Sequence, residues 1–201
     1  MIVGLLPFFQ WGLIELARHP EVHAKLRAEL RTHLGDQDPT YDQLVNGLPY
    51  LDAFTSEVFR LRPAAGEVTR VVSYHILLLD IYPMFTLADD QAVENDILPL
   101  TEPIVTASGT SINSLFIAKG TSIRVPVAGV NRSEALWGSD ADKFNPERWL
   151  VSDTNYEKEN AKREKIQGYR NLLTFALGPR VCIGKNFALT EFKVSFVPDF
   201  S

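Results

Sequence analysis

The one cysteine of the sequence, Cys182, stands in a turn whose residue types suit a bound metal. A metal-binding thiolate needs backbone N–H donors and a positive environment to lower its pKa, and a loop that turns into a helix offers both. Gly178 and Gly184 permit the close backbone approach that a flat macrocycle demands. Arg180 supplies a cation for a carboxylate, and Phe175 supplies a ring to cover the sulfur. The alternative is a glycine-rich turn around a buried structural cysteine.

A second pattern combines one acidic and two basic side chains upstream of the turn. Glu57 and Arg60 are three residues apart on a helix expected over residues 49–62, so they share one face. Taken alone, such a pair is a weak motif, because any Glu-x-x-Arg is commonly an exposed ion pair worth about 0–1 kcal/mol. Arg148 follows in the compact segment 144–149, Phe-Asn-Pro-Glu-Arg-Trp.

Together these motifs resemble those of the cytochrome P450 family. The pattern Phe-x-x-Gly-x-Arg-x-Cys-x-Gly over residues 175–184 is similar to the haem-binding signature of that family at all of its fixed positions. The Glu-x-x-Arg pair and the Pro-Glu-Arg segment resemble two further family motifs, in the family's order. Residues 131–138 look like a stretch common in microsomal-type fungal members. The resemblance covers most of residues 11–193 and implies the C-terminal half of a P450 fold.

The resemblance implies a cofactor, haem b (iron protoporphyrin IX), with Cys182 as the axial thiolate ligand of the iron. A thiolate in this position pushes electron density onto iron and favours O–O cleavage. Arg70 and Arg180 are expected to meet haem propionates, a task that suits guanidinium groups, although Arg70 is equally well a solvated surface side chain. The cofactor-binding residues expected in this chain are Cys182, Phe175, Gly178, Arg180, Gly184 and Arg70.

The resemblance also implies a structural role for the upstream charges. Glu57, Arg60 and Arg148 are expected to form a buried cluster that locks the segment preceding the cysteine turn. Removing one member of such a cluster typically costs about 3–5 kcal/mol.

Apolar periodicity and turn residues predict a mainly α fold with a minor β component. In P450 terms this is a partial fold: the end of the distal helix, the Glu-x-x-Arg helix, the meander, the cysteine turn and the following helix. Strands are expected over 67–72 and 121–127, with an irregular region between them. Helices are expected over 11–18, 20–34, 41–46, 49–62 and 183–194.

The whole chain, residues 1–201, is expected to form a single partial P450 domain, but residues 1–10, 72–91 and 194–201 have no family counterpart. The last two segments open with Val-Ser, and the codons GTG-AGT, which encode Val-Ser, also spell a common intron start. The first two segments end at Gln10 and Gln91, and the glutamine codon CAG also ends introns. We hypothesise that the three segments are translated intron, and that excision of 72–91 restores a continuous strand pair. The alternative is a lineage-specific insertion with a trimmed terminus. The sequence of the spliced transcript decides between them.

Composition excludes several other classes. The net charge of −5 gives no sign of a nucleic-acid partner, and one cysteine allows no internal disulfide. No apolar run reaches the ~18–20 residues of a membrane-spanning helix. His19 and His23 have zinc-compatible spacing, but Pro20 interrupts their helix and no third ligand lies nearby.

The expected function is that of a haem-dependent monooxygenase, which inserts one atom of O2 into an organic substrate with electrons from a reductase. This chain would be its haem-ligand half. No distal acid–threonine pair precedes Trp11, so the fragment holds no catalytic residue and the isolated chain is expected to be inactive. The alternative is a non-catalytic truncated remnant, or a haem-binding module without monooxygenase activity. An intact microsomal-type relative is expected at the endoplasmic reticulum membrane, while the location of this chain stays open.

Overall fold

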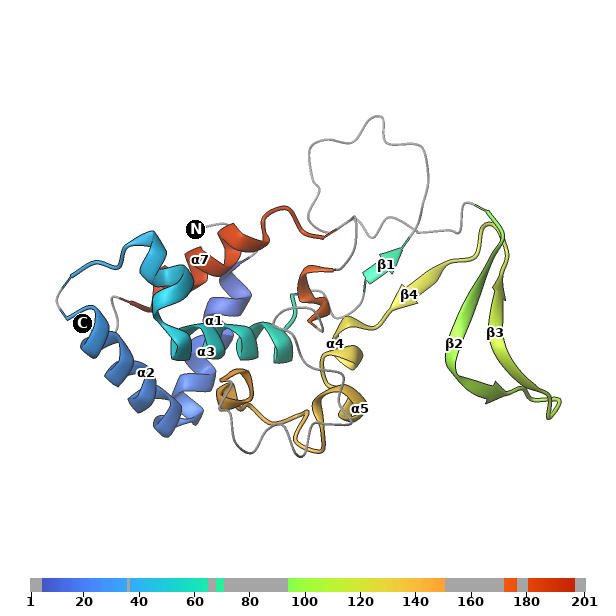
Figure 1. Cartoon of the computed structure of the whole chain (residues 1–201), viewed down its shortest axis with the longest axis horizontal. Helices are drawn as coiled ribbons and strands as arrows, with labels where there is room; N and C mark the ends of the chain where they lie inside the picture. The colour runs from blue at the N-terminus through green and yellow to red at the C-terminus, as the bar shows by residue number, and fades with distance from the viewer. Residues whose placement is uncertain are drawn as a thin grey trace. The chain divides into compact units, whose positions relative to one another are not determined.

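The computed structural model describes residues 5–35, 37–64, 68–70, 94–150, 172–176 and 181–197, with the backbone alone for 68–70. The chain forms two compact units, Met1–Gly66 with Val127–Ser201, and Glu67–Pro126. The helices of Figure 1 are α1 (Leu6–Arg18), α2 (Pro20–His33), α3 (Pro49–Leu61), α4 (Val127–Val130), α5 (Glu134–Trp137) and α7 (Lys185–Phe196). Single helical turns are η2 (Gln43–Gly47), η3 (Pro146–Trp149) and η5 (Leu173–Phe175). The strands are β1 (Val68–Arg70), β2 (Asp96–Val105), β3 (Ser111–Ile117) and β4 (Ile123–Val125).

The expected fold class, mainly α with a minor β component, is confirmed. The helices expected over 20–34, 49–62 and 183–194 are present within two residues of their expected bounds. The short helix expected over 41–46 continues as the π-helical turn η2. Proline opens both α2 and α3, since it lacks the N–H that a first helical turn leaves unpaired.

Helix α3 is the centre of the larger unit. Sequence periodicity predicted one apolar face, but nearly every side chain from Tyr50 to Leu61 is buried. The cause is that α1, α2, α7, η3 and η5 all pack around it. Aromatic rings fill the contacts: Phe59 stacks on Phe8 of α1, with ring centroids 4.0 Å apart, and meets Phe192 of α7 edge-on at 5.2 Å.

Helix α1 approaches α7 closely because of a glycine. A Cβ on Gly12 would lie 2.5 Å from the Phe196 ring, which is fully buried. Helix α1 also begins at Leu6, earlier than the expected 11–18. Phe8 and Phe196 belong to two of the segments hypothesised to be translated intron, and both lie in the core. That hypothesis stays a prediction, and its third segment, 72–91, lies outside the described residues.

The smaller unit holds two antiparallel sheets of two strands each. β1 pairs with β4, and β2 pairs with β3, with Asp96 opposite Ile117 at one end and Val105 opposite Ser111 at the other. The prediction of an irregular region before residue 121 was therefore wrong, because β2 and β3 form a hairpin within it. The missed signal is the turn between β2 and β3, where Gly109 adopts a positive φ of 81°.

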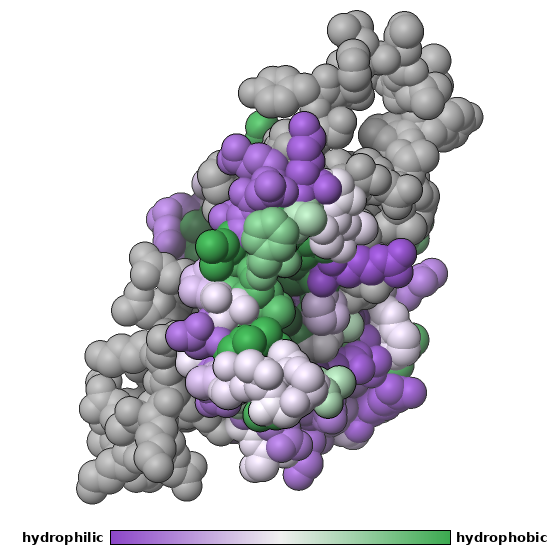
Figure 2. All heavy atoms as spheres, turned by 90° about the vertical axis from the view of Figure 1, so that its right-hand side faces the viewer, coloured by the Kyte–Doolittle hydropathy of each residue, from purple (hydrophilic) through white to green (hydrophobic). Residues whose placement is uncertain are grey.

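The β2–β3 hairpin leaves several apolar side chains uncovered. Ile97, Val105 and Phe116 are 63%, 72% and 67% exposed. Figure 2 shows one face of the molecule, on which hydrophobic side chains (green) lie exposed among hydrophilic ones (purple). The hairpin is therefore held by its backbone ladder, with little apolar burial among the described residues.

Candidate functional site

The segment around Cys182 is closed by backbone hydrogen bonds. Turn η5 ends at Phe175, and Ala176 then reverses the chain with a positive φ of 56°, an uncommon conformation for a residue with a Cβ. The Cys182 N–H donates to the Phe175 carbonyl at 2.8 Å, and the Cys182 carbonyl accepts from Lys185 N at 3.2 Å. The cysteine is thereby fixed just before the first turn of α7.

The thiol of Cys182 is free and exposed, which contradicts the alternative of a buried structural cysteine. The side chains beside it are apolar and uncovered: Val181 is 47% exposed, Ile183 fully exposed and Phe187 59% exposed. The nearest atom to a Cβ built on Gly184 is the Cys182 sulfur, at 3.9 Å. An accessible thiol with an apolar rim at a helix N-terminus fits a flat hydrophobic cofactor that is bound through sulfur.

The other residues expected at the cofactor are only partly described. Phe175 is nearly buried, and its ring stacks on Phe59 with centroids 5.2 Å apart. Gly178, Arg180 and the side chain of Arg70 lie outside the described residues; the Arg70 backbone belongs to β1, opposite Ile123. Their expected contacts with haem therefore stay predictions.

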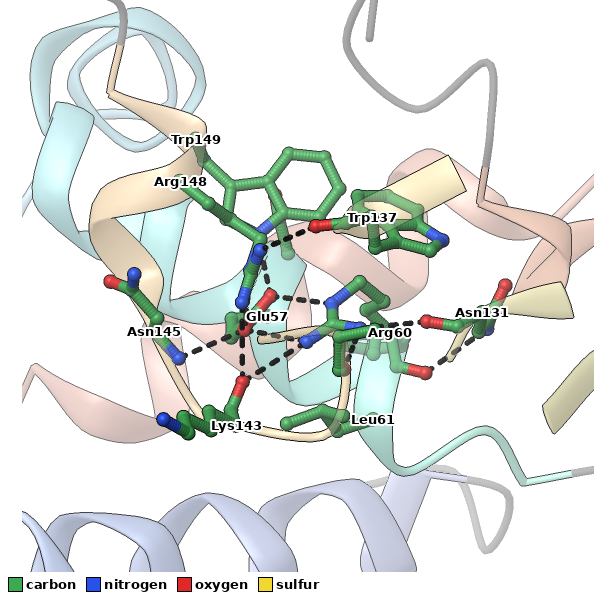
Figure 3. A network of polar contacts seen from close by, with 12 residues as sticks. Glu57, Arg60, Leu61, Asn131, Trp137, Lys143, Asn145, Arg148 and Trp149 are labelled. Atoms are coloured by element: carbon green, nitrogen blue, oxygen red, sulfur yellow. Dashed lines mark hydrogen bonds and ion pairs between the residues drawn. The ribbon is translucent and has the colours of Figure 1, made fainter. Parts of the chain in front are cut away.

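The structure brings Glu57, Arg60 and Arg148 together in a buried network (Figure 3). Glu57 Oε1 accepts from Arg60 Nη2 at 2.8 Å and from Arg148 Nε at 2.9 Å, while Oε2 accepts from Arg60 Nε at 2.8 Å. The backbone N–H of Asn145 and the indole N–H of Trp149 complete the set, each at 2.9 Å. The carboxylate thus joins α3 to both ends of the segment 145–149.

The remaining guanidinium donors of Arg60 bind backbone carbonyls. Arg60 Nη1 donates to Asn131 O at 2.7 Å and to Ala141 O at 2.6 Å, and Nη2 donates to Lys143 O at 3.2 Å. Its guanidinium also lies 5.0 Å from the centroid of the Trp137 ring. One fully buried arginine therefore binds three backbone carbonyls of the segment 131–143.

A second carboxylate, Asp140, balances the charge of the network. Its Oδ2 accepts from Arg148 Nη2 at 3.0 Å, so two carboxylates meet two guanidinium groups. Burial acts to raise the pKa of Asp140, but the hydrogen bond and charge of Arg148 outweigh it, and the pKa lies below its ordinary value. Burial acts to lower the pKa of Arg148, yet the charge of Glu57 and the bond to Asp140 raise it.

Asn131 links this network to the cysteine turn, a role that sequence reasoning did not assign. Its fully buried side chain donates to Arg60 O at 3.1 Å and to Thr174 Oγ1 at 2.9 Å, and accepts from Leu173 N at 3.1 Å. Thr174 Oγ1 in turn donates to Phe59 O at 2.7 Å. The stretch 131–138 was singled out as similar to fungal sequences, but only the fold reveals that its first residue spans two distant segments.

Comparisons with known proteins agree with the motifs. The sequence profile of the family "Cytochrome P450" matches residues 8–86 and 95–197. The cytochrome P450 monooxygenases claQ and claO of Ampulloclitocybe clavipes are each 46% identical, over 92% of this chain and 30% of their own length. Cytochrome P450 monooxygenase 128 of Postia placenta is 39% identical over 91% of this chain and 28% of its own length.

The chain thus spans about 30% of the length of these curated relatives. Among the described residues, none of the helices has the length and apolarity to cross a bilayer. The described residues also contain no cluster of three or more His, Cys, Asp or Glu side chains placed to hold a metal ion. The motifs and fold of the chain, and the profile match over most of its length, show that the chain belongs to the cytochrome P450 family.

Proposed function

We propose that this chain supplies the haem-ligand part of a monooxygenase that inserts one oxygen atom from O2 into an organic substrate. The support is that relatives which match over 91–92% of the chain are named monooxygenases. Because the chain spans about 30% of their length, the activity belongs to the whole protein. A small organic substrate, a reductase as electron donor and attachment to the endoplasmic reticulum membrane are parts of the same proposal.

The observation that carries the proposal is the accessible, apolar-rimmed thiol of Cys182. In this proposal Cys182 would hold haem b through its thiolate, and the exposed side chains of Val181, Ile183 and Phe187 would contact apolar parts of the cofactor. Bound haem supplies the iron at which O2 is activated, and a thiolate ligand favours O–O cleavage. Helix α7, whose N-terminal N–H groups carry partial positive charge, begins three residues after Cys182.

The buried network has a positioning role in this proposal. Glu57, Arg60 and Arg148 hold the region 131–149 in place. Asn131 connects this region to Leu173 and Thr174 by hydrogen bonds. The Phe175 carbonyl then holds the N–H of Cys182. Each link is a hydrogen bond with a fixed direction, so the position of the Cys182 sulfur is set by the protein before any cofactor binds.

The absorption spectrum of the haem-loaded chain tests the proposal. Residues 1–201 are expressed, loaded with haem, reduced under carbon monoxide and compared with Cys182→Ser. We expect the red-shifted Soret band typical of thiolate ligation in the parent chain and its loss in the variant, with equal helical circular dichroism in both. A band typical of histidine-bound or free haem in both proteins would contradict Cys182 as ligand, and would favour a remnant or a module without monooxygenase chemistry.

A further inference from the structure

A cavity of about 290 Å³ lies beside the C-terminal end of α3, within the larger unit. Pro7, Trp11, Pro63 and Ala128 give it apolar walls, and two arginines, Arg62 and Arg132, also line it. Neither Phe175 nor Cys182 borders it, so what binds there is a separate question from the haem ligand.

The charge of Arg62 is already matched. Glu15, only 2% exposed, accepts through one oxygen from Arg62 Nη2 at 2.7 Å and from Nε at 3.1 Å. The guanidinium of Arg62 also lies 3.9 Å from the centroid of the Trp11 ring. Arg62 is therefore a fixed, neutralised part of the cavity wall.

The charge of Arg132 has no such match. A guanidinium carries five N–H donors, and the side chain of Arg132 donates to one acceptor in the described part of the chain, the Leu61 carbonyl, at 2.6 Å from Nη2. Its Nε is buried without a partner, and none of the described carboxylates pairs with it. A buried donor left without an acceptor is destabilising, so Arg132 has unused capacity for an anion.

We propose that this cavity binds a small organic carboxylate, with the carboxylate on Arg132 and the apolar body against Trp11 and the prolines. A guanidinium matches a carboxylate through two parallel hydrogen bonds. The apolar walls favour an organic acid over an inorganic anion such as phosphate. The volume lies close to the lower limit of about 300 Å³ for ligand pockets, which restricts the site to small molecules.

Titration of the chain with benzoate, and with neutral benzamide as the matched probe, tests the site. Heat of binding and tryptophan fluorescence are both followed, because Trp11 lines the cavity. We expect saturable binding of benzoate that is at least about tenfold tighter than that of benzamide, since hydrogen bonds to a charged group add about 1.5–3 kcal/mol. Arg132→Gln should remove this preference, whereas Arg31→Gln, an equal charge change on the exposed side of α2, should keep it.

Glu15→Gln provides a test in the opposite direction. It frees the charge of Arg62 beside the cavity, so benzoate should bind more tightly to this variant than to the parent. Equal affinity for benzoate and benzamide, or a benzoate affinity unchanged in Arg132→Gln, would overturn the proposal. So would failure to bind, or a parent chain without helical circular dichroism, because the cavity exists only when α1 packs against α3.

Discussion

At the scale of single residues, a few buried polar side chains make several hydrogen bonds each. The carboxylate of Glu57 accepts five hydrogen bonds while fully buried, from two guanidinium groups, a backbone amide and an indole. Removal of this carboxylate would be costly, since each of the five donors would be left buried without an acceptor. The network therefore depends on the charge of Glu57 as much as on its shape.

Glu57→Gln should lower the free energy of unfolding by about 3–5 kcal/mol, because it leaves two buried guanidinium groups facing a neutral amide that also brings its own donors. Urea unfolding followed by circular dichroism measures the loss. The matched control is Glu147→Gln, the same change at an exposed carboxylate paired with Lys25, which should cost less than about 1 kcal/mol. Equal losses in the two variants would show that the buried network does not support the fold.

Tyr50 is the opposite case, a buried hydroxyl without a hydrogen-bond partner. Burial, reinforced by the charges of Glu147, Glu21 and Glu29, raises the pKa of Tyr50 from 10.0 to about 12. The folded chain then keeps this proton at a pH where the unfolded chain has lost it. Stability from this group is complete below pH 10.0 and is lost as the pH rises toward about 12.

Tyr50→Phe removes both the unpaired hydroxyl and its titration. At neutral pH we expect the variant to match or exceed the parent in stability, since a buried unsatisfied group is lost. Between pH 10.0 and about 12 the variant should gain on the parent by about 1 kcal/mol per pH unit. Urea unfolding at a series of pH values measures the difference; a constant difference across that range would contradict the shifted pKa.

At the scale of the elements, α3 is held at its N-terminus by a carboxylate from another helix. Its N-cap residue, Leu48, makes no capping hydrogen bond through its side chain. Glu29 of α2 instead accepts from Tyr50 N at 2.7 Å and from Leu51 N at 2.8 Å, one oxygen for each. This cap satisfies the N–H groups of Tyr50 and Leu51, which have no partner within the helix, and places a negative charge at the positive end of the dipole.

Glu29→Ala should therefore destabilise the chain by about 0.5–2 kcal/mol, the range measured for lost N-terminal caps. Glu21→Ala, on an exposed position of the same helix, controls for the loss of charge and side chain from α2. Thermal unfolding of the three proteins gives the comparison. If both variants shift the midpoint equally, the cap contributes nothing beyond the general charge of α2.

The helices were largely predictable because their signals are local. Proline at the start of α2 and α3 and apolar spacing along each fix their bounds from the sequence alone. The ion cluster was foreseen through the family resemblance, with members 91 residues apart in Glu57 and Arg148. The cap by Glu29 and the bridge by Asn131 were not foreseen, because each depends on two elements meeting in space. The hairpin was missed because β2 is exposed at nine of its ten positions, so it lacks the apolar alternation that marks a strand.

At the scale of the whole molecule, the two units differ in what holds them. The larger unit has a continuous apolar core around α3, whereas the strands β2 and β3 leave most of their apolar side chains exposed. A hairpin of this kind adds little free energy from burial. Exposed apolar side chains such as these also favour association with other molecules, further copies of the chain included.

Replacing residues 97–116 by Asn-Gly, which closes a two-residue hairpin turn, should leave the unfolding of the larger unit within about 0.5 kcal/mol of the parent, as for a change away from its core. Urea unfolding followed by the tryptophans, all of which lie in the larger unit at positions 11, 137 and 149, measures this. The same change removes Ile97, Val105 and Phe116 and should reduce self-association in sedimentation experiments. A loss comparable to that of Glu57→Gln would show that the hairpin belongs to the cooperative core, because only a segment whose burial stabilises the larger unit can lower its unfolding free energy so far.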